Sequence, residues 1–303
     1  MIDKGIGVLV PSPLQHLDLP LCREKNINLF VKRDDLIHPV LSGNKYRKSK
    51  YNLEYALQND IKTIITFGGA FSNHLHAIAG ICNDIGIQSI GIVRGDGLDP
   101  RNPTLSWCLE KGMKLFFVPR SVYRLKEKSP EVLKIIKKFP GAMIIPEGGA
   151  NLRALTGVGE IVSELNLQLG RPPDFIFCAS GTGTTAEGLL KEAPASLRIL
   201  SFSVLKTDYL KEEIINNAGK DKSSQLIFNT AYHFGGYARY TPELLSFIAA
   251  KEKETGIEID HVYNGKALFG FFDLLLKNFF PKDSTIVWLH TGGIQGKAGL
   301  GNE

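Results

Sequence analysis

Three short segments of the chain carry side chains whose types and order suggest joint chemistry. A Gly-Asn-Lys turn ends in an amine at Lys45, and a later G-G-A-F-S-N-H turn offers the Ser72 hydroxyl and the Asn73 amide. A third segment, S-G-T-G-T-T at 180–185, combines glycines with hydroxyls as a phosphate site would. An amine that can condense with an aldehyde, together with a phosphate cradle, indicates chemistry on pyridoxal phosphate.

The amine has rivals in the same stretch, N-K-Y-R-K-S-K. Lys45 falls in the first turn of a helix expected to run to about Gln58, and lysines at helix starts are common. Lys48 lies one helical turn further along, where it would be solvated or would face a phosphate. Lys50 is the third alternative. The local pattern alone leaves the choice open.

The Ser72–Asn73 turn has a structural interpretation beside the functional one. It follows a strand and opens a helix, so its backbone N–H groups favour an anion. Ser72 could then bind a substrate carboxylate or exchange a proton, and Asn73 could donate to the cofactor phenolate. Both residue types are also favoured as helix caps, which requires no ligand at all.

The segment at 180–185 joins an apolar strand to a helix. A side chain at Gly181 or Gly183 would hold the backbone away from a phosphate. The segment lacks the G-K-[ST] ending of a Walker A loop, and it is not a complete dinucleotide fingerprint. An ordinary strand–helix turn remains the alternative, as does ordinary packing for Tyr237 and Tyr263. Thr291, after the last strand, could cap a helix or bond a ring nitrogen.

The elements that must position these residues follow from short apolar runs that alternate with amphipathic stretches. Strands are expected at 61–67, 89–93, 114–118, 142–146, 175–179, 199–204 and 285–290. Helices are expected at 73–85, 102–112, 124–139 with a break near 129–130, 158–168, 184–191, 242–255 and 266–278. Fully apolar strands between helices indicate an α/β protein with two open, twisted, mostly parallel-sheet lobes, helices on both faces and a cleft between them.

Composition sets outer limits on function. The 303 residues are 43% hydrophobic and 22% charged, which predicts a packed globular protein. The net charge of +5 is too mild to favour nucleic-acid binding. The four cysteines form no C-x-x-C pair, so neither a metal site nor a disulfide framework is expected. No secretory signal or membrane-spanning run is visible, and a cytoplasmic location is the expectation.

Taken in order, five motifs resemble one family over about Ser12 to Gly293. They are R-D-D-L…G-N-K-Y-R-K, F-G-G-A-F-S-N-H, C-A-S-G-T-G-T-T-A-E-G-L, V-Y-N-G-K-A and H-T-G-G. The chain resembles the pyridoxal-phosphate-dependent 1-aminocyclopropane-1-carboxylate deaminases and D-cysteine desulfhydrases. That resemblance implies the tryptophan-synthase-β fold, also called fold type II, with the cofactor in the cleft, and a homodimer. The two successive series of strands and helices along the chain predict a boundary near Gly148–Gly149, with a small lobe at 44–148 and a large lobe at 1–43 and 149–303 that carries the phosphate loop.

The resemblance assigns roles residue by residue. It places the cofactor-binding lysine at Lys45, the nucleophile or proton-relay serine at Ser72, and the phenolate-binding amide at Asn73. Catalytic tyrosines fall at Tyr263, which also packs on the cofactor ring, and at Tyr237. The implied phosphate-binding residues are Gly181, Thr182, Gly183, Thr184 and Thr185. The resemblance also implies that the cofactor ring meets Thr291 and that the small amino-acid substrate meets Ser72, Asn73, His74 and Tyr237.

Two positions discriminate within the family. Deaminases tend to carry Glu after the ring tyrosine and Leu after the late histidine, whereas desulfhydrases tend to carry Ser or Thr at both. This chain has Asn264 and Thr291, of which Thr291 favours the desulfhydrase side and Asn264 fits neither pattern. The expectation is β-elimination from D-cysteine to pyruvate, ammonia and sulfide. The alternatives are 1-aminocyclopropane-1-carboxylate deamination, a pyridoxal-phosphate-binding protein with little turnover, and a nucleotide-binding module built on the loop at 180–185.

Overall fold

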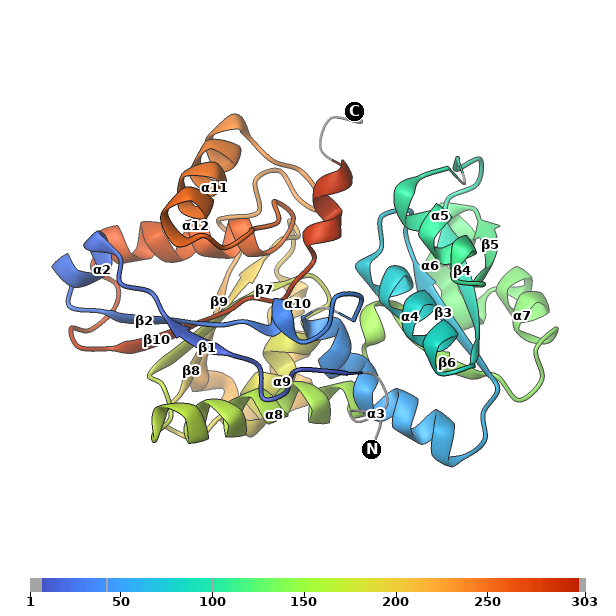
Figure 1. Cartoon of the computed structure of the whole chain (residues 1–303), viewed down its shortest axis with the longest axis horizontal. Coiled ribbons are helices and arrows are strands. Elements are labelled where there is room, and N and C mark those ends of the chain that lie inside the picture. The colour runs from blue at the N-terminus through green and yellow to red at the C-terminus, as the bar shows by residue number, and fades with distance from the viewer. Residues whose placement is uncertain (1–6, 42, 100, 300–303) are drawn as a thin grey trace.

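The structure is a computed structural model that describes residues 7–41, 43–99 and 101–299. Its strands form two separate sheets, which lie in two lobes that stand side by side (Figure 1). The larger sheet has the order β1-β2-β10-β7-β8-β9, and only β1 runs antiparallel to its neighbour. Its strands are β1 (Leu14–His16), β2 (Asn28–Lys32), β7 (Phe175–Ser180), β8 (Arg198–Ser203), β9 (Leu226–Asn229) and β10 (Thr285–Leu289).

Helices cover both faces of this sheet, because its central strands are apolar on both sides. Alternate residues of β7 show this: Phe177 belongs to one core and Cys178 to the other. One face is covered by α2 (Pro20–Glu24), α11 (Pro242–Thr255) and α12 (Asn264–Leu276). The other is covered by α8 (Leu152–Leu169), α9 (Thr184–Glu192) and α10 (Tyr209–Ala218).

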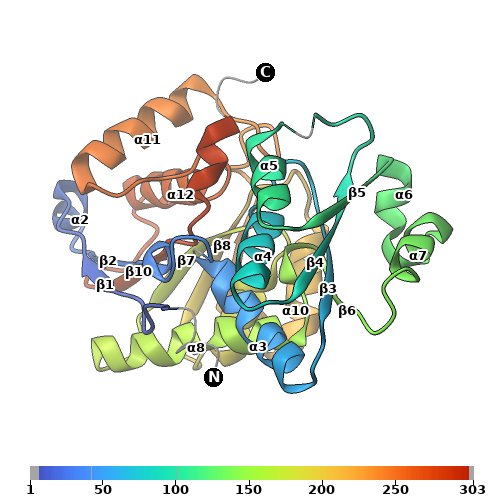
Figure 2. The same ribbon diagram turned by 45° about the vertical axis from the view of Figure 1, so that its right-hand side comes forward.

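The smaller sheet is all parallel, with the order β5-β4-β3-β6. Its strands are β3 (Thr63–Gly68), β4 (Gln88–Arg94), β5 (Lys114–Val118) and β6 (Met143–Ile145). One face packs against α3 (Asn44–Gln58), α4 (Asn73–Asp84) and α5 (Pro103–Glu110). The opposite face packs against α6 (Arg120–Leu125) and α7 (Pro130–Ile136). The turned view separates these two layers clearly (Figure 2). The predicted two-lobed α/β fold is confirmed.

The expected elements agree with the structure where an apolar run is long and its ends carry clear signals. Helix α11 has the expected bounds, with Thr241 accepting from the Leu244 backbone N–H as its cap. The break expected near 129–130 separates α6 from α7, because Pro130 begins a new helix. The sequence analysis did not include β1, β2, β9, α2 or α10. These elements are short or lie at the edges of the large lobe.

Helix α3 carries Lys45 and packs across to the large lobe. Its Arg47 side chain is fully buried and donates to Asp34 at 2.9 Å and to Glu164 of α8 at 2.5 Å. Lys32 of β2 contacts the same Glu164 carboxylate at 2.6 Å. A buried ion network therefore fixes the start of α3 against the large sheet. The division of the chain at 44 and 148 into folding units stays a prediction.

Two short 3-10 turns complete the framework around the lobes' junction, η1 (Asp34–Leu36) and η3 (Glu147–Gly149). Three further 3-10 segments are η2 (Lys126–Lys128), η4 (Lys220–Gln225) and η5 (Ile294–Gly299). Within the described ranges, no helix combines the length and the apolar character needed to cross a membrane.

Candidate active site

The predicted site residues follow the carboxyl ends of strands from both sheets. Strand β3 leads into the Ser72 turn and α4, β7 leads into the loop at 181–183 and α9, and β10 leads into Thr291. In parallel α/β sheets, ligand sites form at this edge. Lys45 enters from the start of α3, and Tyr263 from the start of α12. The site is therefore assembled from both lobes.

The Asn44 side chain links Lys45 to the loop after β7. Lys45 Nζ donates to Asn44 Oδ1 at 2.5 Å, and Asn44 Nδ2 donates to Thr185 Oγ1 at 3.1 Å. Gly43 approaches Thr291 so closely that a Cβ there would lie 1.9 Å from the Thr291 carbonyl oxygen. Gly43 also has φ of 65°, which a side chain would strain. A glycine is thus required to bring the amine to this place.

Burial lowers the pKa of Lys45 from 10.5 to about 8, although the charge of Asp260 opposes the shift. Its rival Lys48 is also buried, at 4% exposure, so the solvated interpretation of Lys48 is wrong. Burial and the neighbouring Lys45 charge hold the pKa of Lys48 well below its usual value. Lys50 instead pairs with Glu160 at 2.8 Å. Two amines, not one, therefore face the interior of the site.

Neither of these amines has an ion-pair partner among the residues that the structure describes. The carboxylates that act on them, Asp260 on Lys45 and Glu187 on Lys48, do so through space. A buried ammonium without a counter-ion is unfavourable, so such a site favours either a neutral amine or a bound anion. The arrangement therefore fits a ligand that brings both an aldehyde for one amine and a phosphate for the other.

The loop after β7 opens α9 and carries hydroxyls at its start. Thr182 and Thr184 hydroxyls are 3.1 Å apart, and Gly148 of η3 approaches Thr182 from the small lobe. A Cβ on Gly181 would lie 3.2 Å from Cε1 of Tyr263, so the loop backbone lies beside that ring. Gly183 has φ of 76°, and a Cβ there would clash with side chains of α10. A glycine is therefore required at 183 by backbone conformation and packing, whether or not the loop binds a phosphate.

The Ser72 turn serves as a helix cap and leaves a donor available. Ser72 Oγ accepts from the Leu75 backbone N–H at 3.2 Å, as an N-cap does. The hydroxyl hydrogen of Ser72 is not used in that bond. Asn73 lies against the segment after β10, since a Cβ on Gly293 would be 2.9 Å from Asn73 Nδ2. The structural and the functional interpretations of this turn are therefore compatible.

His74 presents an unused acceptor to the two lysines. Thr66 Oγ1 donates to the Ile145 carbonyl at 2.8 Å, so at its 2.8 Å contact with His74 Nε2 the imidazole must be the donor. Nδ1 is then an acceptor, and it is buried with no hydrogen-bond partner. Burial, assisted by Lys45 and Lys48, lowers the pKa of His74 to about 3. The ring is therefore neutral at physiological pH.

Tyr263 and Tyr237 meet edge to face with ring centroids 6.1 Å apart. Burial first, and Tyr237 second, hold the pKa of Tyr263 well above its usual value, whereas Tyr237 is 44% exposed. The loop that carries Tyr237 is held by Lys266 of α12, whose fully buried ammonium donates to the carbonyls of His233 at 2.8 Å and Gly236 at 2.7 Å. Lys266 thus connects the two tyrosines.

The Asn264 amide is committed to protein partners. Its Nδ2 donates to Asp260 at 2.7 Å and to the Gly292 carbonyl at 2.8 Å, and its Oδ1 accepts from the Thr291 backbone N–H at 3.1 Å. The fully buried Asp260 carboxylate also accepts the backbone N–H groups of 262, 263 and 264. The Thr291 hydroxyl also donates to Asn264 Oδ1, at 3.4 Å. Asn264 therefore fixes Asp260, Thr291 and Gly292 relative to one another.

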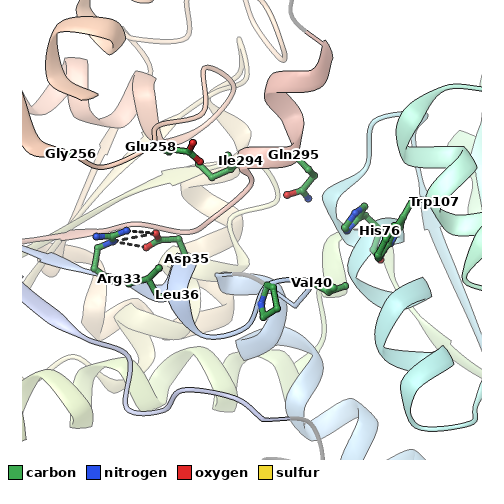
Figure 3. A pocket seen from close by; sticks show the side chains of 11 residues that line it. Arg33, Asp35, Leu36, Val40, His76, Trp107, Gly256, Glu258, Ile294 and Gln295 are labelled. Carbon is green, nitrogen blue, oxygen red and sulfur yellow. Dashed lines mark hydrogen bonds and ion pairs between the residues drawn. The ribbon is translucent and has the colours of Figure 1, made fainter. Parts of the chain in front are cut away.

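A cavity of about 610 Å³ also lies between the lobes, and it is separate from the candidate active site. It is bounded by Arg33, Asp35, His76, Trp107 and the segment at 294–295 (Figure 3). Its arginine is already paired, with Nη2 donating to Asp35 at 2.7 Å, and the His76 ring stacks on Trp107 at 4.8 Å. None of the predicted catalytic or cofactor-binding residues lines it.

The sequence alone did not identify the residues that hold the candidate site residues in position. Arg47 and Lys266 stand inside motifs that were recognised, K-Y-R-K and Y-N-G-K-A, but their partners are backbone or distant carboxylates. Asp260 stands three residues before Tyr263, a spacing that fits an N-terminal cap and that could have found it. Asn44 was treated only as part of the turn.

Comparisons with known proteins give this geometry its context. A family model described as pyridoxal-phosphate-dependent enzyme matches residues 8–292. A Pyrococcus abyssi protein named as a candidate 1-aminocyclopropane-1-carboxylate deaminase is 30% identical and covers 97% of this chain and 93% of its own. The mitochondrial bifunctional D-cysteine desulfhydrase/1-aminocyclopropane-1-carboxylate deaminase of Arabidopsis thaliana is also 30% identical, covering 95% and 77% respectively.

A solved structure described as a homologue of 1-aminocyclopropane-1-carboxylate deaminase superposes with a TM-score of 0.81 at 26% identity. The match covers 96% of this chain and 91% of that one, so both lobes and the junction between them are shared. The expected cofactor and fold type are thereby confirmed. The chain belongs to the family of pyridoxal-phosphate-dependent enzymes, within the group that includes 1-aminocyclopropane-1-carboxylate deaminases and D-cysteine desulfhydrases.

Proposed function

We propose that this enzyme eliminates the thiol of D-cysteine, converting D-cysteine and water into pyruvate, ammonia and hydrogen sulfide. The observation that carries the choice of substrate is the Asn264–Thr291 corner. Asn264 is neutral and its amide is fully engaged, and the nearby Asp260 carboxylate already accepts four N–H groups. A neutral partner supports weaker protonation of the cofactor's ring nitrogen, which suits departure of a thiol better than opening of a carbon ring.

The residues present fit the cofactor. Lys45 would bind the aldehyde, and Lys48 with the loop at 181–185 would bind the phosphate. The phosphate would supply the negative counter-charge that neither amine finds among the described residues. Asn73 would donate to the phenolate oxygen, Tyr263 would pack on the ring, and Thr291 would meet the ring nitrogen. When bound, the cofactor stabilises negative charge at the substrate's α-carbon.

The chain's own groups would do the rest. The Ser72 hydroxyl, the Asn73 amide and the backbone N–H groups at the start of α4, that of His74 included, would bind the substrate carboxylate. The neutral His74 ring would not, because its free Nδ1 is an acceptor. Lys45, whose pKa is about 8, is suited to take a proton from the α-carbon near neutral pH. Tyr263 keeps its proton because its pKa is raised, so Tyr263 or Tyr237 can supply a proton to the departing sulfur.

Two alternatives keep the same site. The first is deamination of 1-aminocyclopropane-1-carboxylate, the activity in the names of several relatives. The second is a pyridoxal-phosphate-binding protein with little turnover. We also propose a cytoplasmic homodimer. The resemblance supports the homodimer, and the four free, buried cysteines fit a reducing compartment.

The test is a comparison of substrates on the purified enzyme loaded with pyridoxal phosphate. Pyruvate and sulfide from D-cysteine are measured beside 2-oxobutyrate from 1-aminocyclopropane-1-carboxylate, and L-cysteine serves as the stereochemical control. We expect D-cysteine to have the higher kcat/KM by at least about tenfold. A preference for the cyclopropane substrate or for L-cysteine would refute the proposal. Intact cofactor binding with no turnover of any substrate would favour the binding protein.

A further inference from the structure

Four side chains gather at the carboxyl edge of the small sheet, outside the residues assigned above. They are Arg94 at the end of β4, Tyr123 in α6, Lys126 in η2 and Glu147 in η3, and we name them the Arg94 cluster. Lys126 Nζ lies 3.3 Å from the centroid of the Tyr123 ring, and the Arg94 guanidinium carbon lies 5.7 Å from it. The Tyr123 ring is therefore the common floor for two cations.

Of these two cations, only Lys126 is neutralised. Lys126 pairs with Glu147 at 2.5 Å, whereas Arg94 has no ion-pair or hydrogen-bond partner in the part of the chain that the structure describes. Arg94 is exposed, so its guanidinium can receive a ligand. The Tyr123 hydroxyl is buried, and the nearby Glu147 carboxylate helps to raise its pKa. The cluster thus has a net positive charge, and Arg94 is its unpaired cation.

The cluster lies beside the proposed substrate-binding turn. A Cβ on Gly69 would be 3.3 Å from Arg94 Nη2, and the Gly69 carbonyl accepts the Ser72 backbone N–H at 3.1 Å. Arg94 therefore lies against the turn that carries Ser72.

The cluster also faces the large lobe's tyrosines across the junction. Burial, then Tyr237 and Asp260, raise the pKa of Tyr263, and Glu147 makes a smaller contribution. Burial and then Glu147 raise the pKa of Tyr123, and Tyr237 makes a smaller contribution. The neighbouring Gly148 approaches Thr182 of the large lobe. A substrate held at Ser72 and beside Tyr263 would thus extend its side chain toward Arg94.

We propose that the Arg94 cluster is a subsite for a carboxylate on the substrate's side chain, with the Arg94 guanidinium as the anion-binding group and the Tyr123 ring as the surface that positions it. The proposal rests on the proposed elimination and deepens it, because it extends the substrate class beyond D-cysteine. The class is a β-thio-substituted D-amino acid whose leaving thiol carries a carboxylate. Arginine is suited to this role because its planar guanidinium matches a carboxylate with two donors.

Two isosteric probes separate charge from size. S-carboxymethyl-D-cysteine carries the carboxylate, and S-carbamoylmethyl-D-cysteine carries a neutral amide of the same shape. In both, the bond between the β-carbon and sulfur breaks, the sulfur leaves with the electron pair and takes up a proton, and the α-proton is lost. With one water, the charged probe gives pyruvate, ammonia and mercaptoacetate, and the neutral probe gives pyruvate, ammonia and mercaptoacetamide.

The experiment measures pyruvate release from both probes with the pyridoxal-phosphate-loaded enzyme. We expect kcat/KM for the charged probe to exceed that for the neutral one by on the order of tenfold, because a hydrogen bond between the Arg94 guanidinium and the carboxylate is stronger than one to a neutral amide. Arg94→Gln should reduce this ratio to about one and leave D-cysteine turnover unchanged. Arg101→Gln, an exposed arginine of the same lobe paired with Asp99, should keep the ratio. High salt should also lower the ratio in the unmodified enzyme.

The outcomes distinguish failure of the subsite from failure of the proposed function. If D-cysteine is consumed but the unmodified enzyme shows no preference for the charged probe, or Arg94→Gln leaves the preference intact, the subsite is refuted alone. If D-cysteine is not consumed, the proposed function fails. In that case the dissociation constants of the two probes are measured instead, from the change that each probe causes in the cofactor's absorbance. The ratio of the constants for the neutral and the charged probe is compared between the unmodified and Arg94→Gln proteins. An unchanged ratio would refute the subsite in that case too.

Discussion

Lys45 and Lys48 lie one helical turn apart on α3, with the Lys48 side chain buried and the Lys45 side chain partly buried. What separates them is their surroundings. Lys45 is linked through Asn44 to Thr185 and feels the charge of Asp260, whereas Lys48 lies nearer Cys178 and Glu187, on the α9 side. One amine is thereby suited to reversible chemistry near neutral pH, and the other to a fixed anion.

The first prediction concerns the pH dependence of cofactor loading. Only the neutral amine attacks an aldehyde, and the Lys45 pKa of about 8 makes about a quarter of it neutral at about pH 7.5, against roughly a thousandth for an ordinary lysine. Because this pKa is lowered, the loading rate should rise with pH and level off above about 8.

Stopped-flow absorbance after mixing the cofactor-free protein with pyridoxal phosphate checks this profile. Lys266 also has a pKa of about 8, so a Lys266→Met variant is measured in parallel and should keep the midpoint. A rate that still rises steeply above about pH 9.5 would contradict the lowered pKa of Lys45.

The second prediction concerns Lys48→Met. Removing this buried amine should lower the affinity for pyridoxal phosphate by about 10- to 100-fold, since a charged hydrogen bond to the phosphate is lost. The cofactor-free protein should be no less stable, because the variant buries no charge. Lys50→Met, which loses a pair with Glu160 outside the candidate site, is the matched control. Equal dissociation constants for the Lys48→Met and unmodified proteins would rule out this role.

At the scale of elements, α3 depends on its anchorage to the large lobe. Arg47 neutralises Asp34 and, together with Lys32, Glu164, so Arg47→Met should leave the buried Asp34 carboxylate without its ion-pair partner and Glu164 with Lys32 alone. Loss of one partner of a buried network costs about 3–5 kcal/mol. Urea unfolding measures this loss, and Arg101→Met at the surface should be without effect. A shift no larger than that of the control would show that the network is not stabilising.

The loop before Tyr237 depends on one side chain of α12. Lys266→Met removes both bonds to the carbonyls of His233 and Gly236, so Tyr237 should lose its fixed position against Tyr263. We expect kcat for D-cysteine to fall about tenfold, while cofactor content stays full and proteolysis within 233–240 becomes faster. Lys277→Met, at the exposed C-terminal cap of the same helix, is the control. An unchanged kcat in Lys266→Met would show that Lys266 does not position Tyr237 for the reaction.

Element prediction from sequence succeeded where local signals were strong and failed where tertiary contacts decide. The apolar strand 114–118 and helix α11 were predicted with their observed bounds. Helix α8 begins at Leu152, six residues before the expected start, because Asn151 caps it in a stretch whose apolar spacing is weak. Strand β2 was not anticipated, although its pairing with β10 completes the large sheet.

At the scale of the molecule, the site exists because two sheets direct their carboxyl edges toward one junction. Local motifs could indicate an amine, a hydroxyl turn and a phosphate loop, but not that Gly43 must contact Thr291 or that Gly148 must approach Thr182. Those close approaches join segments far apart in the sequence. The ordered resemblance supplied what spacing could not, whereas Lys266 and the Arg94 cluster emerged only from three-dimensional contacts.

The central claim is that the cofactor is bound covalently through Lys45, with Lys48 as the phosphate's partner. Borohydride reduction of the pyridoxal-phosphate-loaded protein, followed by peptide mass mapping, tests it most directly. The account predicts a single pyridoxyl label on Lys45, loss of that label and of turnover in Lys45→Ala, and retention of the label in Lys48→Met at saturating cofactor. A label on Lys48 or on any other lysine of the unmodified protein would contradict it.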